Sequence, residues 1–145
     1  MLIVSACLLG IDCRYDAFSR LNPLLREKAQ REGYIPICPE QLGGLPTPRQ
    51  AVFIQGGNGF DVLDGKCKVC DQAGNDLTAQ LIRGAFETLK IAKLLVIRKA
   101  ILKERSPSCA VQFTTSHQEL IQGPGVTAAL LLREGIEVIS DESLK

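Results

Sequence analysis

Short apolar runs alternate along the chain with longer stretches in which apolar positions recur every three to five residues. Four runs have the length and composition of buried strands, at residues 2–5, 34–37, 94–97 and 136–139. The helical spacing is clearest in the stretch that precedes the third run, where apolar residues from 77 to 89 form one face. The pattern therefore predicts strands that alternate with helices.

Start and stop signals place the three predicted helices. Asn22 can cap the first helix, with Pro23 at its first position and Gly33 after its end. Asp76 can cap the longest helix in the same way. Residues 123 and 124, a Gly-Pro pair, open the last helix, and Gly135 ends it.

Alternating strands and helices predict parallel βαβ units with right-handed crossovers. The fold class is α/β, a three-layer Rossmann-like fold with a small, mostly parallel sheet. Residues 1–145 are expected to form a single domain, since 145 residues suffice for one core. Pro36 lies inside the second strand and cannot donate to a ladder, so that strand is expected at an edge.

Two long segments interrupt this alternation. Residues 39–75 and 98–122 contain glycine pairs, prolines and the peptide SPSC, with little periodicity. Long irregular segments in a small domain are usually functional, so both are predicted to be loops or lids around a site.

Composition restricts the partners. The formal net charge is +1, which gives no electrostatic reason to expect a polymeric nucleic acid or a membrane surface as partner. The apolar start lacks a basic segment and soon meets Asp12 and Arg14, so it is not expected to be a signal peptide. We expect a cytoplasmic protein, in which six cysteines serve metal binding or catalysis rather than disulfides. The oligomeric state stays open.

Three cysteines follow predicted strand ends or their loops: Cys7, Cys38 and Cys109. The carboxyl ends of parallel strands face the crevice in which α/β proteins bind ligands. Glycine, proline and serine surround each cysteine, and such turns expose backbone N–H groups that stabilise thiolates. Three widely spaced thiolates suit an iron–sulfur cluster with one open iron better than a structural zinc site, which usually has four ligands. The alternative reading is that each is a small buried apolar residue.

The remaining soft ligands are less easily placed. Cys67 and Cys70 form a C-x-x-C pair without a second pair, which fits a zinc half-site, a redox dithiol or a turn. Cys13 can approach the site or pack beneath its loop. His117, the one histidine, is expected on the surface or in a loop.

Three motifs carry a family resemblance: SACLLG-x-x-CRYD at the start, CPEQLGGLPTPR in the middle and LKERSPSC later. The chain resembles a family of short bacterial proteins, catalogued as domain of unknown function 523, that includes the thiouracil desulfidases. The resemblance covers nearly the whole chain. It implies that Cys7, Cys38 and Cys109 bind a [4Fe–4S] cluster whose fourth iron takes sulfur from a thiolated pyrimidine.

The same resemblance marks Glu40 and Ser106 as the catalytic pair. A carboxylate two residues from Cys38 can move the protons that hydrolysis of a C=S bond requires, and a serine can orient water or the pyrimidine. The alternative roles are a carboxylate that anchors its loop and a serine that only forms a turn. Ala17 and Ala110 stand where the family pattern has glycine.

The sequence thus predicts a cluster-dependent desulfidase that removes sulfur as hydrosulfide, without redox chemistry, from a small thiolated pyrimidine. The alternative is a non-catalytic zinc or iron–sulfur protein that handles sulfide or redox. Arg14, Arg49 and Lys103 are candidates for contact with a phosphate or a uracil carbonyl, or for ion pairs with Asp12, Asp16 or Glu104. Whether the substrate is a free base, a nucleotide or another thioamide stays open.

Overall fold

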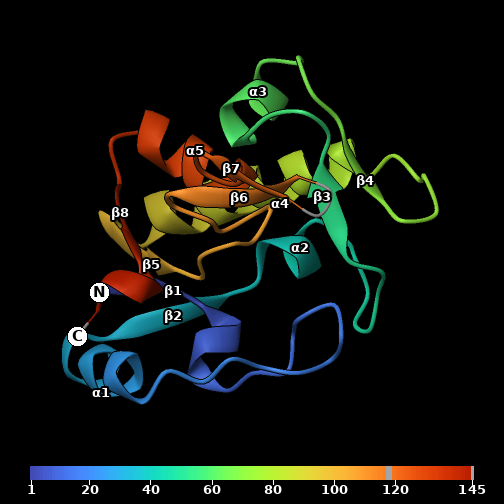
Figure 1. The fold of residues 1–145 in the computed structure, drawn as a ribbon. Coiled ribbons are helices and arrows are strands. Elements are labelled where there is room, and N and C mark those ends of the chain that lie inside the picture. Colours follow the sequence, from blue (N-terminus) through green and yellow to red (C-terminus); the bar gives the residue numbers. More distant parts are fainter. Residues whose placement is uncertain (117–118, 145) are drawn as a thin grey trace.

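The centre of the molecule is a four-stranded parallel sheet, seen in a computed structural model that describes residues 1–116 and 119–144 (Figure 1). The strand order is β2 (Tyr34–Ile37), β1 (Leu2–Ser5), β5 (Lys99–Leu102) and β8 (Glu137–Ser140). Every neighbouring pair runs parallel. The predicted α/β class is confirmed.

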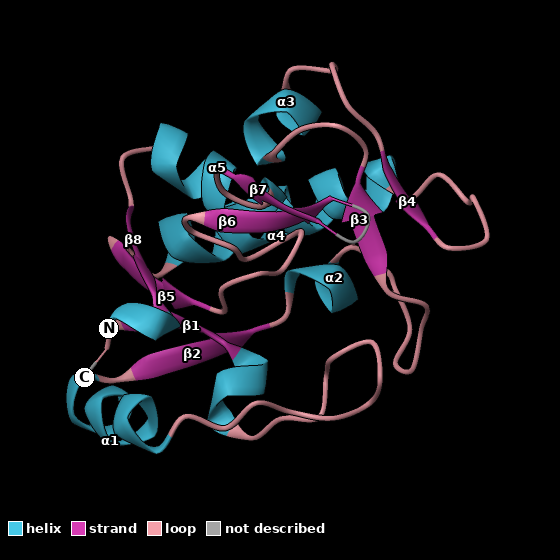
Figure 2. Cartoon of the chain, in the orientation of Figure 1, coloured by secondary structure: helices cyan, strands magenta, loops and turns pink. Residues whose placement is uncertain are grey.

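Helices and smaller strands complete the chain (Figure 2). The helices are η1 (Ala6–Leu9), α1 (Pro23–Glu32), α2 (Pro39–Leu42), α3 (Gly59–Leu63), α4 (Thr78–Leu94), α5 (Val126–Arg133) and η2 (Asp141–Ser143), where η marks a 3-10 helix. Two antiparallel hairpins pair β3 (Val52–Ile54) with β4 (Val69–Asp71) and β6 (Phe113–Ser116) with β7 (Glu119–Gln122). Among the described residues, no helix has the length and apolarity that crossing a membrane requires.

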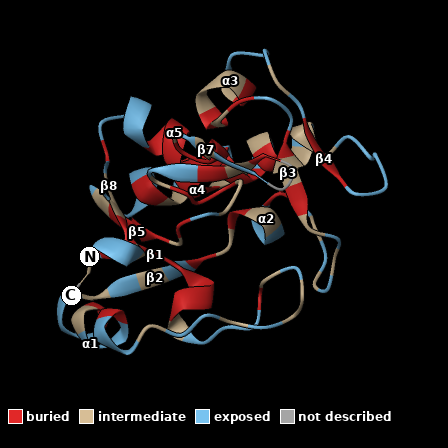
Figure 3. Cartoon of the chain, viewed as in Figure 1, coloured by how far each residue is buried: buried red, intermediate tan, exposed pale blue. Residues whose placement is uncertain are grey.

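The sheet separates two apolar clusters, which makes the fold three-layered. Leu2, Val4 and Ile101 pack with Leu25 and Ala29 of α1 on one face. Strand side chains that point to the other face of the sheet, such as that of Ile3, pack with α4 and α5. The buried residues accordingly follow β1, β5 and the inner faces of α4 and α5 (Figure 3).

The first helix and the second strand form as predicted. The Asn22 side chain accepts a hydrogen bond from the N–H of Leu25 at 3.1 Å, and Pro23 occupies the first turn. Gly33 ends the helix with φ of 79°, a backbone conformation that favours glycine. Pro36 lies in β2, which is an edge strand, so its missing N–H costs no interior ladder bond.

The predicted strand at residues 94–97 is wrong. Helix α4 continues through Leu94, and the strand that follows is β5, at Lys99–Leu102. In the apolar run that favoured a strand, only Ile97 is buried, whereas Leu94 is 80% exposed and Val96 is 72% exposed. Apolar composition alone cannot distinguish a helix end from a short strand, and here the α-helical hydrogen bonds extend into that run.

Smaller shifts occur at other boundaries. The last strand begins at Glu137, one residue later than predicted. Helix α4 begins at Thr78 after Leu77, so Asp76 is not the N-cap residue itself, although its carboxylate accepts a hydrogen bond from the Thr78 N–H at 3.0 Å. The last helix begins at Val126 with Gly125 as its cap.

The two segments predicted as long loops hold regular structure. Residues 39–75 contain α2, β3, α3 and β4, and residues 98–122 contain β5, β6 and β7. Helix α2 packs closely on α4 through two glycines, because a Cβ on Gly43 would overlap the backbone at Gln80 and a Cβ on Gly84 would overlap the backbone at Pro39. This close contact fixes the segment that carries Cys38 and Glu40.

Candidate active site at the carboxyl edge of the sheet

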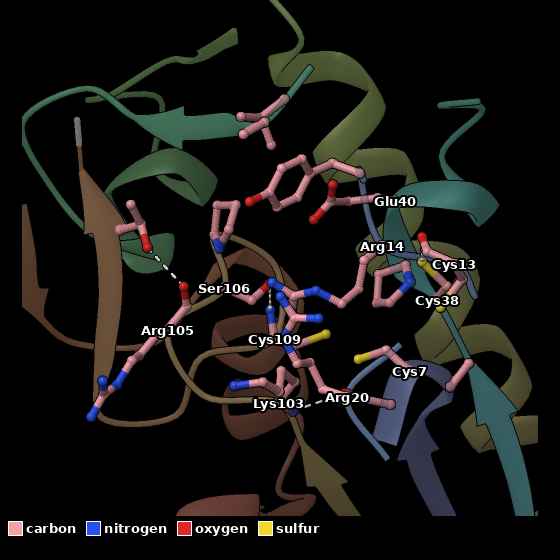
Figure 4. Close-up of a pocket in the computed structure, with 18 of the residues that line it drawn as sticks. Cys7, Cys13, Arg14, Arg20, Cys38, Glu40, Lys103, Arg105, Ser106 and Cys109 are labelled. Atoms are coloured by element: carbon pink, nitrogen blue, oxygen red, sulfur yellow. Dashed lines mark hydrogen bonds between the residues drawn. The ribbon is translucent and has the colours of Figure 1, made fainter. Parts of the chain in front are cut away.

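One cavity of about 350 Å³ opens where β1, β2 and β5 end. The structure brings all three predicted cluster ligands into its lining (Figure 4). Cys7 lies in η1 directly after β1, Cys38 precedes α2 directly after β2, and Cys109 lies in the turn that follows β5. All three are free thiols, and Cys7 and Cys109 are buried. The parallel sheet thus gathers cysteines that are far apart in the sequence.

Cys13 is a fourth thiol in this cavity. It is 2% exposed, and its carbonyl oxygen accepts a hydrogen bond from the Cys38 Sγ at 3.7 Å. Hydrogen bonding with the Cys13 thiol lowers the pKa of Cys7. Hydrogen bonds with the Cys13 thiol and with the backbone of Gln41 lower the pKa of Cys38 to about 6. The same contacts, to Cys38 first, raise the pKa of Cys13. The hydrogen bond with Cys13 thus favours the thiolate form of Cys38, the form that binds metal.

Cys109 differs from the other thiols. Burial raises its pKa, and the charges of Cys7, Cys38 and Glu40 add to this effect. A metal centre would have to displace this proton, so binding at Cys109 is coupled to proton release.

The donor set fits an iron–sulfur cluster. Within residues 1–116 and 119–144, no three His, Cys, Asp or Glu side chains lie close enough together to hold a single metal ion. A [4Fe–4S] cube binds each thiolate at a different iron, and its ligands are therefore farther apart than those of one tetrahedral ion. Three cysteine thiols around one cavity are suitable ligands for such a cube.

Glu40 lies in the first turn of α2 and faces the same cavity. One carboxylate oxygen, Oε1, lies 3.1 Å from Arg49 Nε, and the other, Oε2, accepts a hydrogen bond from Ser108 Oγ at 3.1 Å. The side chains of Glu40 and Arg49 are only 14% and 7% exposed. The carboxylate is consequently held in one orientation from two sides.

Ser106 and Ser108 have different surroundings. Ser106 lines the cavity, and its Oγ accepts hydrogen bonds from the N–H groups of Ser108 at 3.2 Å and Cys109 at 3.1 Å. Sequence reasoning did not find Ser108, which is 1% exposed and contacts Glu40 directly. Nothing local distinguishes the two serines of SPSC, because the contact to Glu40 joins residues 68 positions apart.

Arg49 connects three parts of the site. Besides Glu40, its guanidinium donates from Nη1 to the carbonyl of Cys13 at 3.1 Å and to Thr47 Oγ1 at 3.0 Å. Its backbone N–H donates to the Tyr15 carbonyl at 2.8 Å. Arg49 therefore braces the residue 13–15 segment against the Glu40 carboxylate, and it is not free to bind a phosphate as the sequence had allowed.

Arg14 and Lys103, the other predicted basic contacts, line the cavity, and so do Arg20 and Arg105, which the sequence reasoning did not name. The Arg105 guanidinium instead pairs with Glu142, with Nε 3.2 Å from Oε2. Lys103 Nζ donates to the Glu104 carbonyl at 3.1 Å. Arg20 Nη2 lies 3.7 Å from Asp16 Oδ2, whereas Arg14 and Lys103 line the cavity without an ion pair among the described residues.

Glu104 is a buried carboxylate that holds neighbouring main-chain segments in place. Its Oε1 accepts hydrogen bonds from the backbone N–H groups of Val111, Gln112 and Phe113, at 2.8 to 3.1 Å. Its own N–H donates to Asp141 Oδ1 at 2.7 Å. These bonds fix the chain on both sides of SPSC, and they hold Ser106 and Cys109 at the cavity.

The C-x-x-C pair lies elsewhere. Cys70 belongs to β4, opposite Phe53 of β3, and Cys67 packs against Gly57. Neither residue lines the cavity, and burial raises the pKa of both thiols. The pair is separate from the site that holds the other four cysteines. His117 lies outside the described residues.

Comparison with known proteins agrees with this geometry. The family model for 2-thiouracil desulfurase matches residues 2–143. A solved structure described as [4Fe-4S]-dependent thiouracil desulfidase TudS shares 38% identity, with a TM-score of 0.86, over 99% of this chain and 91% of that chain. The uncharacterized protein YbbK of Bacillus subtilis is 42% identical over 147 residues, 99% of this chain and 97% of its own length.

The chain belongs to the 2-thiouracil desulfurase family. The predicted family resemblance is confirmed, and the fold matches that of the thiouracil desulfidase over the whole chain. The two departures from the family pattern are visible in the backbone. Ala17 has φ of 62°, a left-handed conformation that favours glycine. Ala110 is fully buried beside Cys109 and donates its N–H to the Ser106 carbonyl.

Proposed function

We propose that this protein is a [4Fe–4S]-dependent desulfidase that hydrolyses the C=S bond of a thiolated pyrimidine and releases hydrosulfide. The observation that carries the proposal is one cavity that contains Cys7, Cys38 and Cys109 together with the braced carboxylate of Glu40. A protein that only carries metal or sulfide needs no carboxylate held by two partners beside the thiols. The arrangement therefore favours an enzyme over a carrier.

Cys7, Cys38 and Cys109 are the residues that would hold the cluster. Three thiolate ligands would leave one iron open, and a bound cluster would supply a thiophilic Lewis acid for the sulfur of a C=S bond. The cationic side chains of Arg14 and Lys103 lower the pKa of Cys7 in addition to the Cys13 hydrogen bond. They also offset the negative charge that thiolates and inorganic sulfides bring into the cavity.

Glu40 acts as the base. It takes a proton from the attacking water, whose oxygen forms the new C–O bond while the C–S bond breaks and sulfur leaves with the electron pair. One proton of the water ends on Glu40 and the other on the leaving sulfur, so a thione and water give a carbonyl compound and hydrosulfide without any change in oxidation state, and Glu40 then releases its proton to solvent. Arg49 and Ser108 keep the carboxylate directed into the cavity throughout.

Ser106 acts as a hydrogen-bond donor to the water or the pyrimidine. Its oxygen already accepts two backbone N–H groups, so its own hydroxyl proton is directed elsewhere. Its position on the cavity wall beside Cys109 supports this role.

The charge of the cavity favours an anionic substrate, such as a thiolated nucleotide, over a neutral free base. Both lining carboxylates have partners: Glu40 pairs with Arg49, and Oε1 of Glu104 accepts from backbone N–H groups, whereas Oε2 of Glu104 is buried without a hydrogen-bond partner among the described residues. Arg20 and Lys103 remain at the cavity as cations that can contact a phosphate. A small-molecule substrate is expected, since the net charge of +1 gives no electrostatic reason to expect a polymeric nucleic acid.

A stoichiometric assay tests the proposal. Protein reconstituted under anaerobic conditions is incubated with 2-thiouracil, 4-thiouracil or 4-thiouridine monophosphate, without any reductant. We expect one hydrosulfide for each desulfurated pyrimidine, and the nucleotide to be the best substrate. A strict requirement for dithionite, or sulfur recovered as a persulfide on Cys67 or Cys70, would contradict hydrolysis. A colourless protein that retains zinc would contradict the cluster.

A further inference from the structure

Arg14 lines the cavity and carries an unsatisfied donor. Its Nε is buried and has no hydrogen-bond partner among the described residues, although Arg14 lines the cavity that also holds Glu40, Ser106 and Cys109. A guanidinium has five N–H donors and no acceptor, and a buried donor without a partner is costly. A bound molecule with an acceptor atom at this depth would satisfy it.

Both backbone polar groups of Arg14 have hydrogen-bond partners. Its N–H donates to the Phe18 carbonyl at 3.2 Å, and its carbonyl accepts from the Ala17 N–H at 2.9 Å. On either side, the carbonyls of Cys13 and Tyr15 accept hydrogen bonds from Arg49. These bonds fix the main chain from which the Arg14 guanidinium extends. Figure 4 shows the Arg14 side chain extending into the space between Glu40, Cys109 and Ser106.

Tyr15 provides an aromatic surface next to this donor. Tyr15 is the aromatic residue in the cavity lining, and it is 39% exposed. The Cζ atom of Arg14 lies 5.7 Å from the centroid of the Tyr15 ring. A planar ring can stack on tyrosine whatever substituents it carries. A guanidinium, in contrast, binds preferentially to a ring with a hydrogen-bond acceptor in its plane.

We propose that Arg14 is the specificity-determining residue for the base: its guanidinium donates to the exocyclic carbonyl oxygen that a thiouracil keeps beside its C=S group, while Tyr15 stacks on the ring. The proposal rests on the proposed function and adds to it the atom of the substrate that is recognised. The buried Nε favours this neutral oxygen over a phosphate, because a phosphate is strongly hydrated and a buried donor excludes that water; Arg20 and Lys103 also line the cavity and can serve a phosphate.

Two pairs of compounds test this assignment. The first pair is 2-thiouracil and pyrimidine-2-thione, which lacks the second carbonyl and the N3–H that accompanies it, and the measured quantity is the ratio of their kcat/KM values in each variant against the parental protein. The second pair is uracil and pyrimidin-2-one, and the measured quantity is the ratio of their Kd values by calorimetry. The holoprotein is compared with Arg14→Met, Arg14→Lys and Tyr15→Leu, each with its iron content determined.

Arg133→Met is the matched control. Arg133 also lies over an aromatic ring, with Cζ 5.0 Å from the centroid of Phe60, but its guanidinium pairs with Asp64 at the surface. We expect Arg133→Met to leave the ratio of kcat/KM values and the ratio of Kd values unchanged from the parental protein. Losing a hydrogen bond from a charged donor corresponds to a change of roughly 10- to 150-fold in a rate or binding constant. Arg14→Met should therefore lower kcat/KM for 2-thiouracil and the affinity for uracil by that factor. The values for pyrimidine-2-thione and pyrimidin-2-one should stay unchanged.

The remaining variants separate the possible failures. Tyr15→Leu should weaken both members of each pair alike. Arg14→Lys keeps the positive charge, but an ammonium group cannot occupy the Nε position. This variant should therefore also lose the discrimination between the two members of each pair. It serves as the test variant if Arg14→Met loses iron. Parental ratios in an Arg14 variant with full iron content would overturn the proposal. If no thione releases hydrosulfide from the parental protein, the proposed function fails, and the uracil pair still decides the role of Arg14.

Discussion

The guanidinium Nε of Arg49 lies 3.1 Å from Oε1 of Glu40, and both side chains are largely withdrawn from solvent. A buried ion pair is stable when further hydrogen bonds satisfy both partners. Here Ser108 serves the second carboxylate oxygen, and the Cys13 carbonyl accepts from the guanidinium. The pair thus joins the proposed base to the loop that carries Arg14.

Removing Arg49 should destabilise the apoprotein. Arg49→Met leaves the Glu40 charge buried without its partner, which typically costs about 3–5 kcal/mol of the free energy of unfolding. Urea unfolding of the apoprotein measures this loss. Arg133→Met, which removes an exposed pair, should lower the free energy of unfolding far less. The double variant Arg49→Met, Glu40→Gln should be more stable than Arg49→Met alone, and equal instability would argue against the pairing.

Glu40→Gln should separate catalysis from cluster binding. The amide keeps the shape of the carboxylate, so iron content and the visible spectrum should match the parental protein. The rate should fall by about 10²–10⁴-fold, because a positioned acid or base is lost. Turnover of thiouracil at the parental rate would show that Glu40 only anchors its loop. Ser108→Ala, which releases one carboxylate oxygen, should cause a smaller loss.

Single replacements of cysteine should define the ligand set. Cys7→Ser, Cys38→Ser and Cys109→Ser each remove a thiol from the cavity and should abolish retention of iron after identical reconstitution. Cys67→Ser and Cys70→Ser should retain it, because neither lines the cavity. Iron and acid-labile sulfide per chain are the measurement. Full loss of iron in Cys67→Ser would mean that the ligands have been assigned wrongly.

The apoprotein should show lowered thiol pKa values at Cys7 and Cys38. Hydrogen bonding from Cys13 lowers the pKa of Cys38 to about 6, whereas burial raises the pKa of Cys109. Alkylation by iodoacetamide, followed by mass spectrometry, should therefore modify Cys38 with a midpoint near pH 6 and leave Cys109 slow at neutral pH. Because the pKa of Cys38 is lowered on folding from 9.0, its contribution to stability is lost as the pH falls from about 9 through about 6. An alkylation midpoint near 9 would contradict the hydrogen bond from Cys13.

The sequence by itself determined the class of fold and the family. The strands at 2–5 and 34–37 and the helix from Pro23 to Gly33 follow from local signals: apolar runs, an asparagine cap, and proline and glycine at the helix ends. Pro36 even placed its strand at the edge, since a missing N–H is tolerated only there. Cysteines after strand ends had to meet, because parallel strands bring their carboxyl ends to the same side of the sheet.

Only the tertiary structure decided which side chains contact each other. It placed Cys13 in the cavity and left Cys67 and Cys70 outside, it gave Ser108 rather than Ser106 the contact with Glu40, and it paired Glu40 with Arg49. It also continued α4 through the apolar run at 94–97. Periodicity reports the burial of a residue, not its partner. The partner of Glu40 depends on how closely α2 packs on α4 through Gly43 and Gly84, because that distance sets where the carboxylate lies.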